Sequence, residues 1–255
     1  MTDPDAAPQP TAAMIVIGDE VLSGRTRDIN TWVLAQAMTA MGIRLAEARI
    51  VPDETPRIVA AVRELSASVD HVFTSGGIGP THDDITADAM AEAFGASIGI
   101  RGDARAILEA YYEPGALNDA RLRMARIPDG ATLILNPVSQ APGFRIGNVH
   151  VMAGVPAIFA AMLDSVKPTL TGGAPTLSHA LRAPLPEGEI AVPLGAIAAA
   201  HPRVSVGSYP FFRGGLGTTL VARATDRAAL DAAVADIRAM CATMGVSDMQ
   251  ETAPD

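Results

Sequence analysis

Several features that would narrow the function are missing from the sequence, and each absence excludes a class of protein. The 255 residues include one cysteine, Cys241, so the chain cannot form an internal disulfide, which fits a reducing compartment. No Cys/His spacing typical of a zinc site occurs, and no run of eighteen apolar residues could span a membrane. The N-terminal segment MTDPDAAPQPT lacks the basic region and apolar run of a signal peptide. We therefore expect a cytoplasmic protein.

Positive charge is also scarce. Lys and Arg number 19 against 28 Asp and Glu, which makes the formal net charge −9. This balance disfavours nucleic acid and anionic membranes as partners. An acidic chain can still bind phosphate locally, because backbone N–H groups can surround an anion. The composition therefore favours a small-molecule partner and allows that partner to carry phosphate.

What the sequence does contain is a hydrophobic content of 49%, enough for a sizeable core, in a pattern of alternating strands and helices. Strands are predicted at 14–17, 43–51 and 70–74. Each is followed by a predicted helix, and these helices begin near Asp28, Thr55 and Asp84. Later segments add two helices across 103–126, strands near 133–135 and 149–152, and a helix after Pro156. The alternation predicts a three-layer α/β fold, a mainly parallel sheet with helices on both faces.

The pattern changes after residue 168. Residues 169–175 are rich in proline and glycine, which is typical of a linker. Residues 176–250 then predict a small α+β domain with the order strand, helix, strand, strand, helix. Residues 1–11 carry three prolines and predict a disordered tail. The main domain is therefore expected at 12–168.

The strongest functional signal is the string TSGGIGPTHDDIT at 74–86, where a predicted strand runs into a helix. Its glycines allow a ligand to approach the backbone, and the following helix points its first N–H groups at the same place. The residues expected to bind phosphate or another ligand group here are Thr74, Ser75, Gly76, Gly77, Ile78, Gly79, Thr81 and Thr86. The string is neither a Walker loop nor a G-x-G-x-x-G fingerprint.

Two carboxylates in this string, Asp83 and Asp84, do not suit simple anion binding. Beside a phosphate they indicate a bridging divalent cation or a proton acceptor. The alternative is an ordinary strand-to-helix turn in which Asp84 is the N-cap of the helix.

Two further loops are expected at the same edge, because ligands of parallel sheets bind beyond the carboxyl ends of the strands. One is 18–30, in which Asp19 and Glu20 could hold a metal ion, and the other is the turn at 153–156. Ligand contacts are expected from Gly18, Ser23, Gly24, Asn30 and Gly154. The alternative for 18–30 is a solvated loop in which Asp28 caps a helix. Asp53 follows the strand at 43–51 and is expected at the same edge.

Other residues are interpreted as structural. His82 is expected in a loop rather than on a metal, and Trp32 and Cys241 are expected in the core. The segment Tyr209-Pro-Phe-Phe212 is interpreted mainly as packing within the second domain.

Four strings in this order carry a family resemblance: GDEVLSGRTRDIN, VPDE, TSGGIGPTHDDIT and AGVP. Over residues 12–168 the chain resembles the molybdopterin-binding domain of the MoaB/Mog type. The resemblance is closest to the N-terminal part of competence/damage-inducible protein A, and it extends to the molybdopterin-binding-like domain of FAD synthases. VSVGSYPFF at 204–212 is similar to the small domain that follows this module.

The resemblance implies two enzymatic chemistries and leaves a third reading open. Competence-protein-like members hydrolyse the pyrophosphate of ADP-ribose or FAD with a divalent metal, and this is the favoured prediction. Molybdenum-cofactor members instead transfer adenylate to molybdopterin. The third reading is a pterin- or nucleotide-binding module without turnover. A homo-oligomer, dimer or trimer, is also implied.

Under either enzymatic chemistry, the resemblance implies that Asp84 and Asp53 match the functional aspartates of the family. The metal, Mg, Mn or Co, would be held by Asp84, Asp83, Asp19 and Glu20. Two departures from the family pattern stand out. The C-terminal amidohydrolase domain of the competence protein does not fit in 255 residues, and Ala153 stands where the family often has proline.

Overall fold

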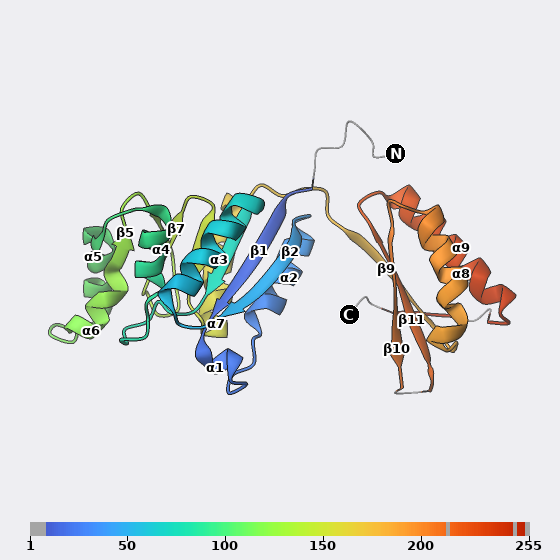
Figure 1. The fold of residues 1–255 in the computed structure, drawn as a ribbon, viewed down its shortest axis with the longest axis horizontal. Coiled ribbons are helices and arrows are strands. Elements are labelled where there is room, and N and C mark those ends of the chain that lie inside the picture. The colour runs from blue at the N-terminus through green and yellow to red at the C-terminus, as the bar shows by residue number, and fades with distance from the viewer. Residues whose placement is uncertain (1–8, 213–214, 247–248, 253–255) are drawn as a thin grey trace. The chain divides into compact units, whose positions relative to one another are not determined.

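The chain forms two compact units in the computed structural model (Figure 1), which describes residues 9–212, 215–246 and 249–252. The first unit comprises residues 9–173, and the second begins at Ala174. The change of unit falls within the proline- and glycine-rich segment 169–175.

A six-stranded sheet forms the centre of the first unit, in the order β2-β1-β3-β8-β7-β6. The four parallel strands are β2 (Arg44–Val51), β1 (Thr11–Ile17), β3 (His71–Ser75) and β8 (Val149–Met152). The last two, β7 (Gly143–Ile146) and β6 (Thr132–Ile134), run antiparallel to their neighbours. The prediction of a mainly parallel sheet is confirmed, although β7 was not predicted.

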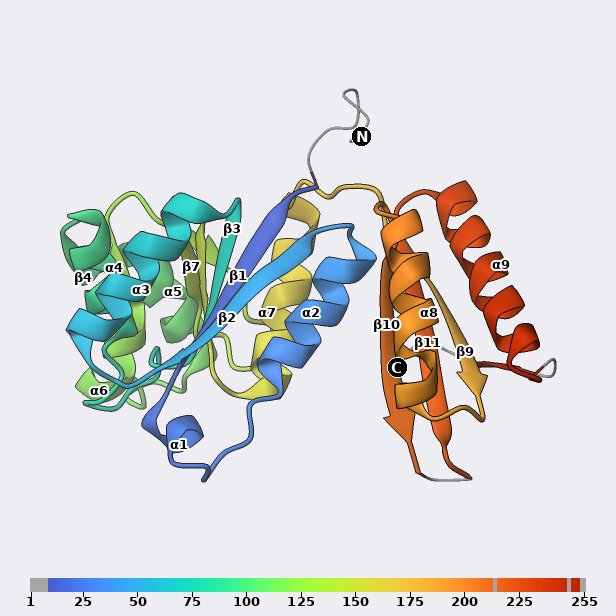
Figure 2. The ribbon, with the colours of Figure 1, turned by 45° about the vertical axis from the view of Figure 1, so that its right-hand side comes forward.

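Helices cover both faces of this sheet because β1 is apolar on both sides. Ala13, Ile15 and Ile17 pack into one core, while alternate residues such as Met14 and Val16 pack into the other. The first core lies under α3 (Thr55–Ser68), α4 (Thr86–Phe94) and α5 (Gly102–Tyr111). The second lies under α2 (Asn30–Ala40) and α7 (Pro156–Val166). Figure 2 shows α3 and α4 on one side of β1 and α2 and α7 on the other.

Short elements complete the first unit. They are α1 (Asp19–Leu22), β4 (Ile98–Ile100), α6 (Asp119–Leu122), η1 (Arg123–Ala125), β5 (Arg126–Pro128) and η2 (Lys167–Thr169). β4 and β5 pair with each other as a separate two-stranded sheet. Elements of three or four residues carry no periodicity of their own, so neither strand was predicted from the sequence.

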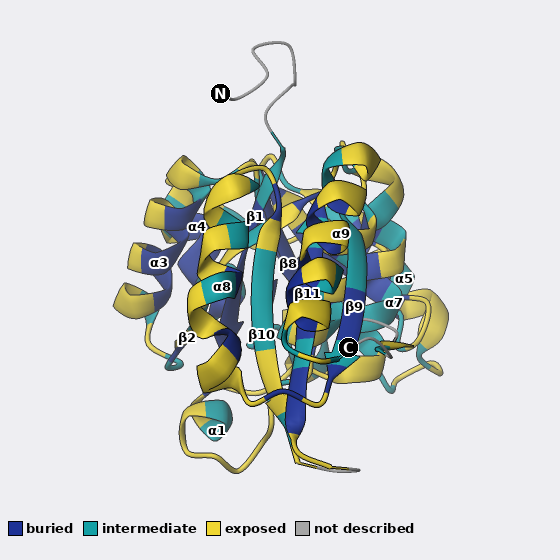
Figure 3. Ribbon diagram, turned by 90° about the vertical axis from the view of Figure 1, so that its right-hand side faces the viewer, coloured by how far each residue is buried: buried dark blue, intermediate teal, exposed yellow. Residues whose placement is uncertain are grey.

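The second unit is a four-stranded antiparallel sheet with two helices. The strand order is β10-β11-β9-β12, from β9 (Leu177–Ala183), β10 (Ser205–Phe211), β11 (Gly217–Ala224) and β12 (Gln250–Thr252). The helices α8 (Glu187–Ala200) and α9 (Arg227–Thr243) share one core with this sheet. Most residues of α8 are exposed to solvent (Figure 3). The predicted α+β domain is confirmed, with β12 as an additional strand.

Two interpretations of apolar residues were wrong. Trp32 is 61% exposed, because α2 buries Leu34 and Met38, one turn apart, and Trp32 lies on another side of that helix. Tyr209 and Phe212 are 49% and 77% exposed, so they do not pack in the core. Cys241 is fully buried, as expected.

No helix in the described part of the chain is both long and apolar enough to cross a membrane.

Candidate functional site

The carboxyl ends of the four parallel strands bring the three predicted loops together, and Asn30 joins them. Asn30 is 4% exposed, and its Nδ2 donates to Ser75 Oγ at 2.6 Å and to the Gly154 carbonyl at 2.7 Å. Gly154 in turn lies against Gly76, since a Cβ built on Gly154 would be 3.3 Å from the Gly76 Cα. The predicted convergence of 18–30, 74–86 and 153–156 is therefore present in the structure.

The first two glycines of the 74–86 loop have no room for a side chain. Gly76 has φ +111°, and a Cβ there would lie 2.2 Å from the Ile17 carbonyl oxygen. Gly77 has φ +67°, and a Cβ there would lie 2.1 Å from Thr86 Oγ1. The loop is thus pressed against the end of β1 and the start of α4, in a backbone conformation that glycine adopts readily.

Three of the four hydroxyl groups predicted to bind a ligand in this loop are buried. Thr74, Ser75 and Thr86 are each at most 2% exposed. Thr86 Oγ1 donates to the Gly76 carbonyl at 3.0 Å, which ties the first turn of α4 to the loop. Thr81 is exposed at the outer end of the loop.

Only part of the loop backbone is available to a ligand. The Gly76 N–H donates to the Met152 carbonyl at 3.2 Å, and the Gly79 N–H donates to Asp84 Oδ1 at 2.7 Å. The N–H groups of Gly77 and Ile78 have no acceptor among the described residues. Successive free backbone N–H groups in a glycine turn are the kind of donors that bind anions.

Asp84 organises this loop. Its carboxylate accepts hydrogen bonds from the Gly79 N–H, from the Thr81 N–H at 2.8 Å and from Thr81 Oγ1 at 2.6 Å. The helix begins two residues later at Thr86 with Ile85 as N-cap, so the alternative in which Asp84 caps the helix is wrong. Because a carboxylate offers about four lone-pair positions, three hydrogen bonds leave Asp84 able to bind one further group.

Asp53 lies at the same edge, among other acidic residues. Its Oδ2 accepts a hydrogen bond from the Asp19 N–H at 2.9 Å. Burial raises the pKa of Asp53, and the negative charges of Asp19, Glu20 and Asp83 raise it further, against the lowering effect of that hydrogen bond. The four carboxylates therefore interact electrostatically, and a proton or a cation at Asp53 would relieve their repulsion.

The four carboxylates have the right chemistry for a divalent cation, but they are not arranged as a formed metal site. Among the described residues, no three His, Cys, Asp or Glu side chains converge as a metal site. Carboxylate oxygens are nevertheless the ligands that Mg²⁺ and Mn²⁺ prefer. Asp19 and Asp83 are exposed, so their side chains can reorient.

The remaining predicted residues lie farther out or act through the backbone. Ser23 and Gly24 are exposed, and Ser23 Oγ donates to the Glu20 carbonyl at 3.3 Å. The Gly18 N–H donates to the Val51 carbonyl, which joins the ends of β1 and β2. His82 is a loop residue with a 99% exposed side chain.

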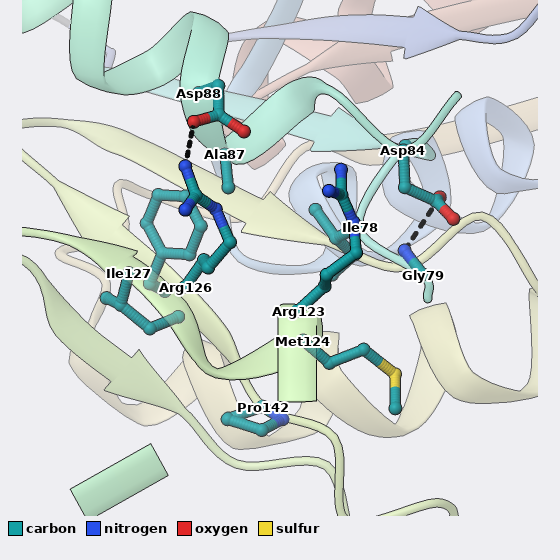
Figure 4. Close-up of a pocket in the computed structure, with 12 residues that line it drawn as sticks. Ile78, Gly79, Asp84, Ala87, Asp88, Arg123, Met124, Arg126, Ile127 and Pro142 are labelled. Atoms are coloured by element: carbon teal, nitrogen blue, oxygen red, sulfur yellow. Dashed lines mark hydrogen bonds and ion pairs between the residues drawn. The ribbon is translucent and has the colours of Figure 1, made fainter. Parts of the chain in front are cut away.

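Sequence reasoning missed one wall of the site. A pocket extends from Gly77, Ile78 and Gly79 along the start of α4 to η1, β5 and β7 (Figure 4). Its far wall is formed by Arg123, Met124, Arg126, Ile127, Pro142 and Phe144. No motif marks these residues. They reach the loop only because β5 packs near α4 and because β7 begins at the edge where β8 ends.

The comparison with protein families agrees with this geometry. A family model described as "Probable molybdopterin binding domain" matches residues 13–172, which is more than half of the chain. The chain belongs to the molybdopterin-binding domain family. A second model, "FAD synthase, middle domain", matches residues 175–250, the second unit.

Individual relatives place the chain in the CinA-like part of this family. A CinA-like protein of Citrifermentans bemidjiense is 40% identical over 167 residues, which cover 63% of this chain and 40% of that protein. A protein of Pyrobaculum calidifontis is 35% identical over 212 residues, covering 79% of this chain and 81% of that protein. The crystal structure of CinA from Thermoplasma acidophilum is 33% identical with a TM-score of 0.60, covering 63% of this chain and 98% of that one. The chain thus spans less than half of the CinA-like protein of Citrifermentans bemidjiense.

Proposed function

We propose that the chain binds a nucleotide with a pyrophosphate group at this edge of the sheet and hydrolyses that group with the help of a divalent cation. The observation that carries the proposal is the pair of free N–H groups of Gly77 and Ile78, which lie in one loop with Asp84. Backbone N–H groups can bind a phosphate, and a neighbouring carboxylate can bind a metal ion that offsets the phosphate's negative charge. ADP-ribose and FAD are the substrates that we favour.

Each residue of the site has a separate task in this proposal. The N–H groups of Gly77 and Ile78 hold a phosphate oxygen, and Asp84 keeps the loop in shape for them. Asp53, whose pKa burial and neighbouring charges raise, is suited to accept a proton from an attacking water. Asp84, Asp83, Asp19 and Glu20 would hold Mg²⁺, Mn²⁺ or Co²⁺. The ion would neutralise the negative charge that develops on the phosphate and lower the pKa of a bound water.

Adenylyl transfer to molybdopterin is the second candidate, supported by the match of residues 13–172 to the molybdopterin-binding family. It would use the same loop for the nucleotide phosphate and a different acceptor. The likeness to CinA-like proteins, which are 40% and 36% identical in two species, favours hydrolysis. Binding of a pterin or nucleotide without turnover is the third candidate.

The test is release of AMP from ADP-ribose and FAD by the purified chain with Mg²⁺, Mn²⁺ or Co²⁺. Since Asp84 also shapes the loop, its replacement by Asn, which keeps an acceptor oxygen, is more informative than Ala. We expect Asp84→Asn and Asp53→Asn each to lower kcat by about 100-fold or more. Asp103→Asn is the control, because Asp103 is exposed, is paired with Arg101 and does not line the pocket.

A chain that binds these nucleotides but releases no AMP with any of the three metals would exclude the hydrolase. Formation of adenylated molybdopterin from ATP would then favour transfer. Binding without either product would favour the non-catalytic module.

A further inference from the structure

The pocket beside the glycine loop is lined by Arg123, a cationic side chain with no partner among the described residues. Residues 101–126 contain five arginines, and four of them have a hydrogen-bond or ion-pair partner. Arg101 pairs with Asp103, Arg105 with Glu109 and Arg126 with Asp88, while Arg121 donates to the Ala116 carbonyl. Arg123 has no hydrogen bond or ion pair within the described part of the chain.

Neither of the two carboxylates that line the pocket pairs with Arg123. Asp88 is paired with Arg126, and Asp84 accepts hydrogen bonds from the Gly79 and Thr81 groups of its own loop. Figure 4 shows the Arg123 side chain extending from η1 toward the loop segment that carries Ile78, between the Asp88–Arg126 pair and Asp84. The arginine therefore presents its charge to the pocket rather than to a carboxylate of the protein.

We infer that Arg123, which is exposed and lines the same pocket as Gly77 and Ile78, binds a second phosphate of the ligand. A planar guanidinium forms two parallel hydrogen bonds with a phosphate, whereas two backbone N–H groups suffice for one phosphate oxygen. Two anion-binding groups that line one open pocket suit two linked phosphates better than one. The inference rests on the proposed nucleotide site, and it specifies a diphosphate as the feature that the pocket recognises.

The alternative is that Arg123 is an ordinary solvated surface arginine, since it is exposed. The two readings differ in what they predict for ligands of different phosphate content. A solvated arginine would affect every ligand alike or none of them. A phosphate-binding arginine affects a diphosphate strongly and a ligand without phosphate not at all.

Titration calorimetry on the full chain with ADP-ribose, AMP and adenosine tests this inference. We expect Arg123→Gln to weaken ADP-ribose binding by about tenfold or more, because it removes a charge-assisted pair. Adenosine binding should not change, and Arg123→Lys should recover part of the loss. Arg105→Gln is the matched control, as this arginine is exposed, has a carboxylate partner and lies outside the pocket.

A second measurement separates this inference from the proposed function. Inorganic pyrophosphate should raise the melting temperature of the unaltered chain and of Arg105→Gln, and raise it much less in Arg123→Gln. This result can hold even if the chain hydrolyses no nucleotide. Equal pyrophosphate stabilisation of the unaltered chain and Arg123→Gln, or no stabilisation of either, would overturn the inference. So would an equal loss of ADP-ribose and adenosine binding.

Discussion

Mild acid should destabilise the first unit through one buried histidine. His150 on β8 is 1% exposed and stacks on Phe73, with ring centroids 4.8 Å apart and an interplanar angle of 16°. Neither of its ring nitrogens has a hydrogen-bond partner among the described residues. Burial, together with the charges of His71 and Arg145, lowers the pKa of His150 to about 3. The ring is therefore neutral in the folded chain at pH 5, whereas in the unfolded chain it is protonated.

The size of the effect follows from the two pKa values. The unfolded pKa is 6.5, so above that value neither state binds the proton and His150 adds no pH dependence. Below it, the unfolded chain gains a proton that the folded chain does not accept, and the free energy of unfolding falls by about 1.4 kcal/mol per pH unit. Between pH 7.5 and pH 5 the loss amounts to about 2 kcal/mol.

Urea unfolding at pH 7.5 and pH 5 measures this loss. The only tryptophan, Trp32, lies on α2 in the same unit, so its fluorescence follows the unit that contains His150. We expect the His150→Leu variant to lose about 2 kcal/mol less than the unaltered chain between the two pH values. His82→Gln is the control, because its side chain is 99% exposed. Equal pH dependence in the unaltered chain and His150→Leu would refute the reasoning.

Three further predictions concern the candidate site. Gly77→Ala should lower the free energy of unfolding by more than the cost of a strained backbone, which is about 1–3 kcal/mol, because the added Cβ would also clash with Thr86. Gly24→Ala is the control in the same urea assay and should cost less, because Gly24 also has a positive φ of +74° but nothing lies within 4 Å of an added Cβ. Asn30→Ala should lower the free energy of unfolding by about 1–3 kcal/mol, because it leaves the buried Ser75 hydroxyl without its donor, and an unchanged urea midpoint would contradict this. Mn²⁺ should raise the melting temperature of the unaltered chain more than that of Asp53→Asn, since the cation relieves the repulsion that raises the Asp53 pKa; equal shifts would argue against a metal at this residue.

Much of the site could be predicted because its signals are local. Gly76 and Gly77 follow an apolar strand directly, and a turn that requires positive φ is a property of neighbouring residues. The loops at 18–30 and 153–156 were placed at the same edge because parallel strands all end there. Only the folded structure shows which backbone atoms of these loops a ligand can reach. The Gly76 N–H is already bonded to the Met152 carbonyl, and the Gly79 N–H to Asp84 Oδ1.

The sequence by itself determined the alternating strands and helices, the two-part organisation of the chain and the position of the glycine loop. These follow from residue periodicity and turn chemistry, which act within a few residues. Tertiary structure alone decided that Trp32 is exposed, that His150 is buried without a partner and that Arg123 faces the glycine loop. Asn30 reaches a carbonyl 124 residues away, and no local pattern records such a contact. Burial and hydrogen-bond partners depend on which distant segments pack together, and that is a property of the whole fold.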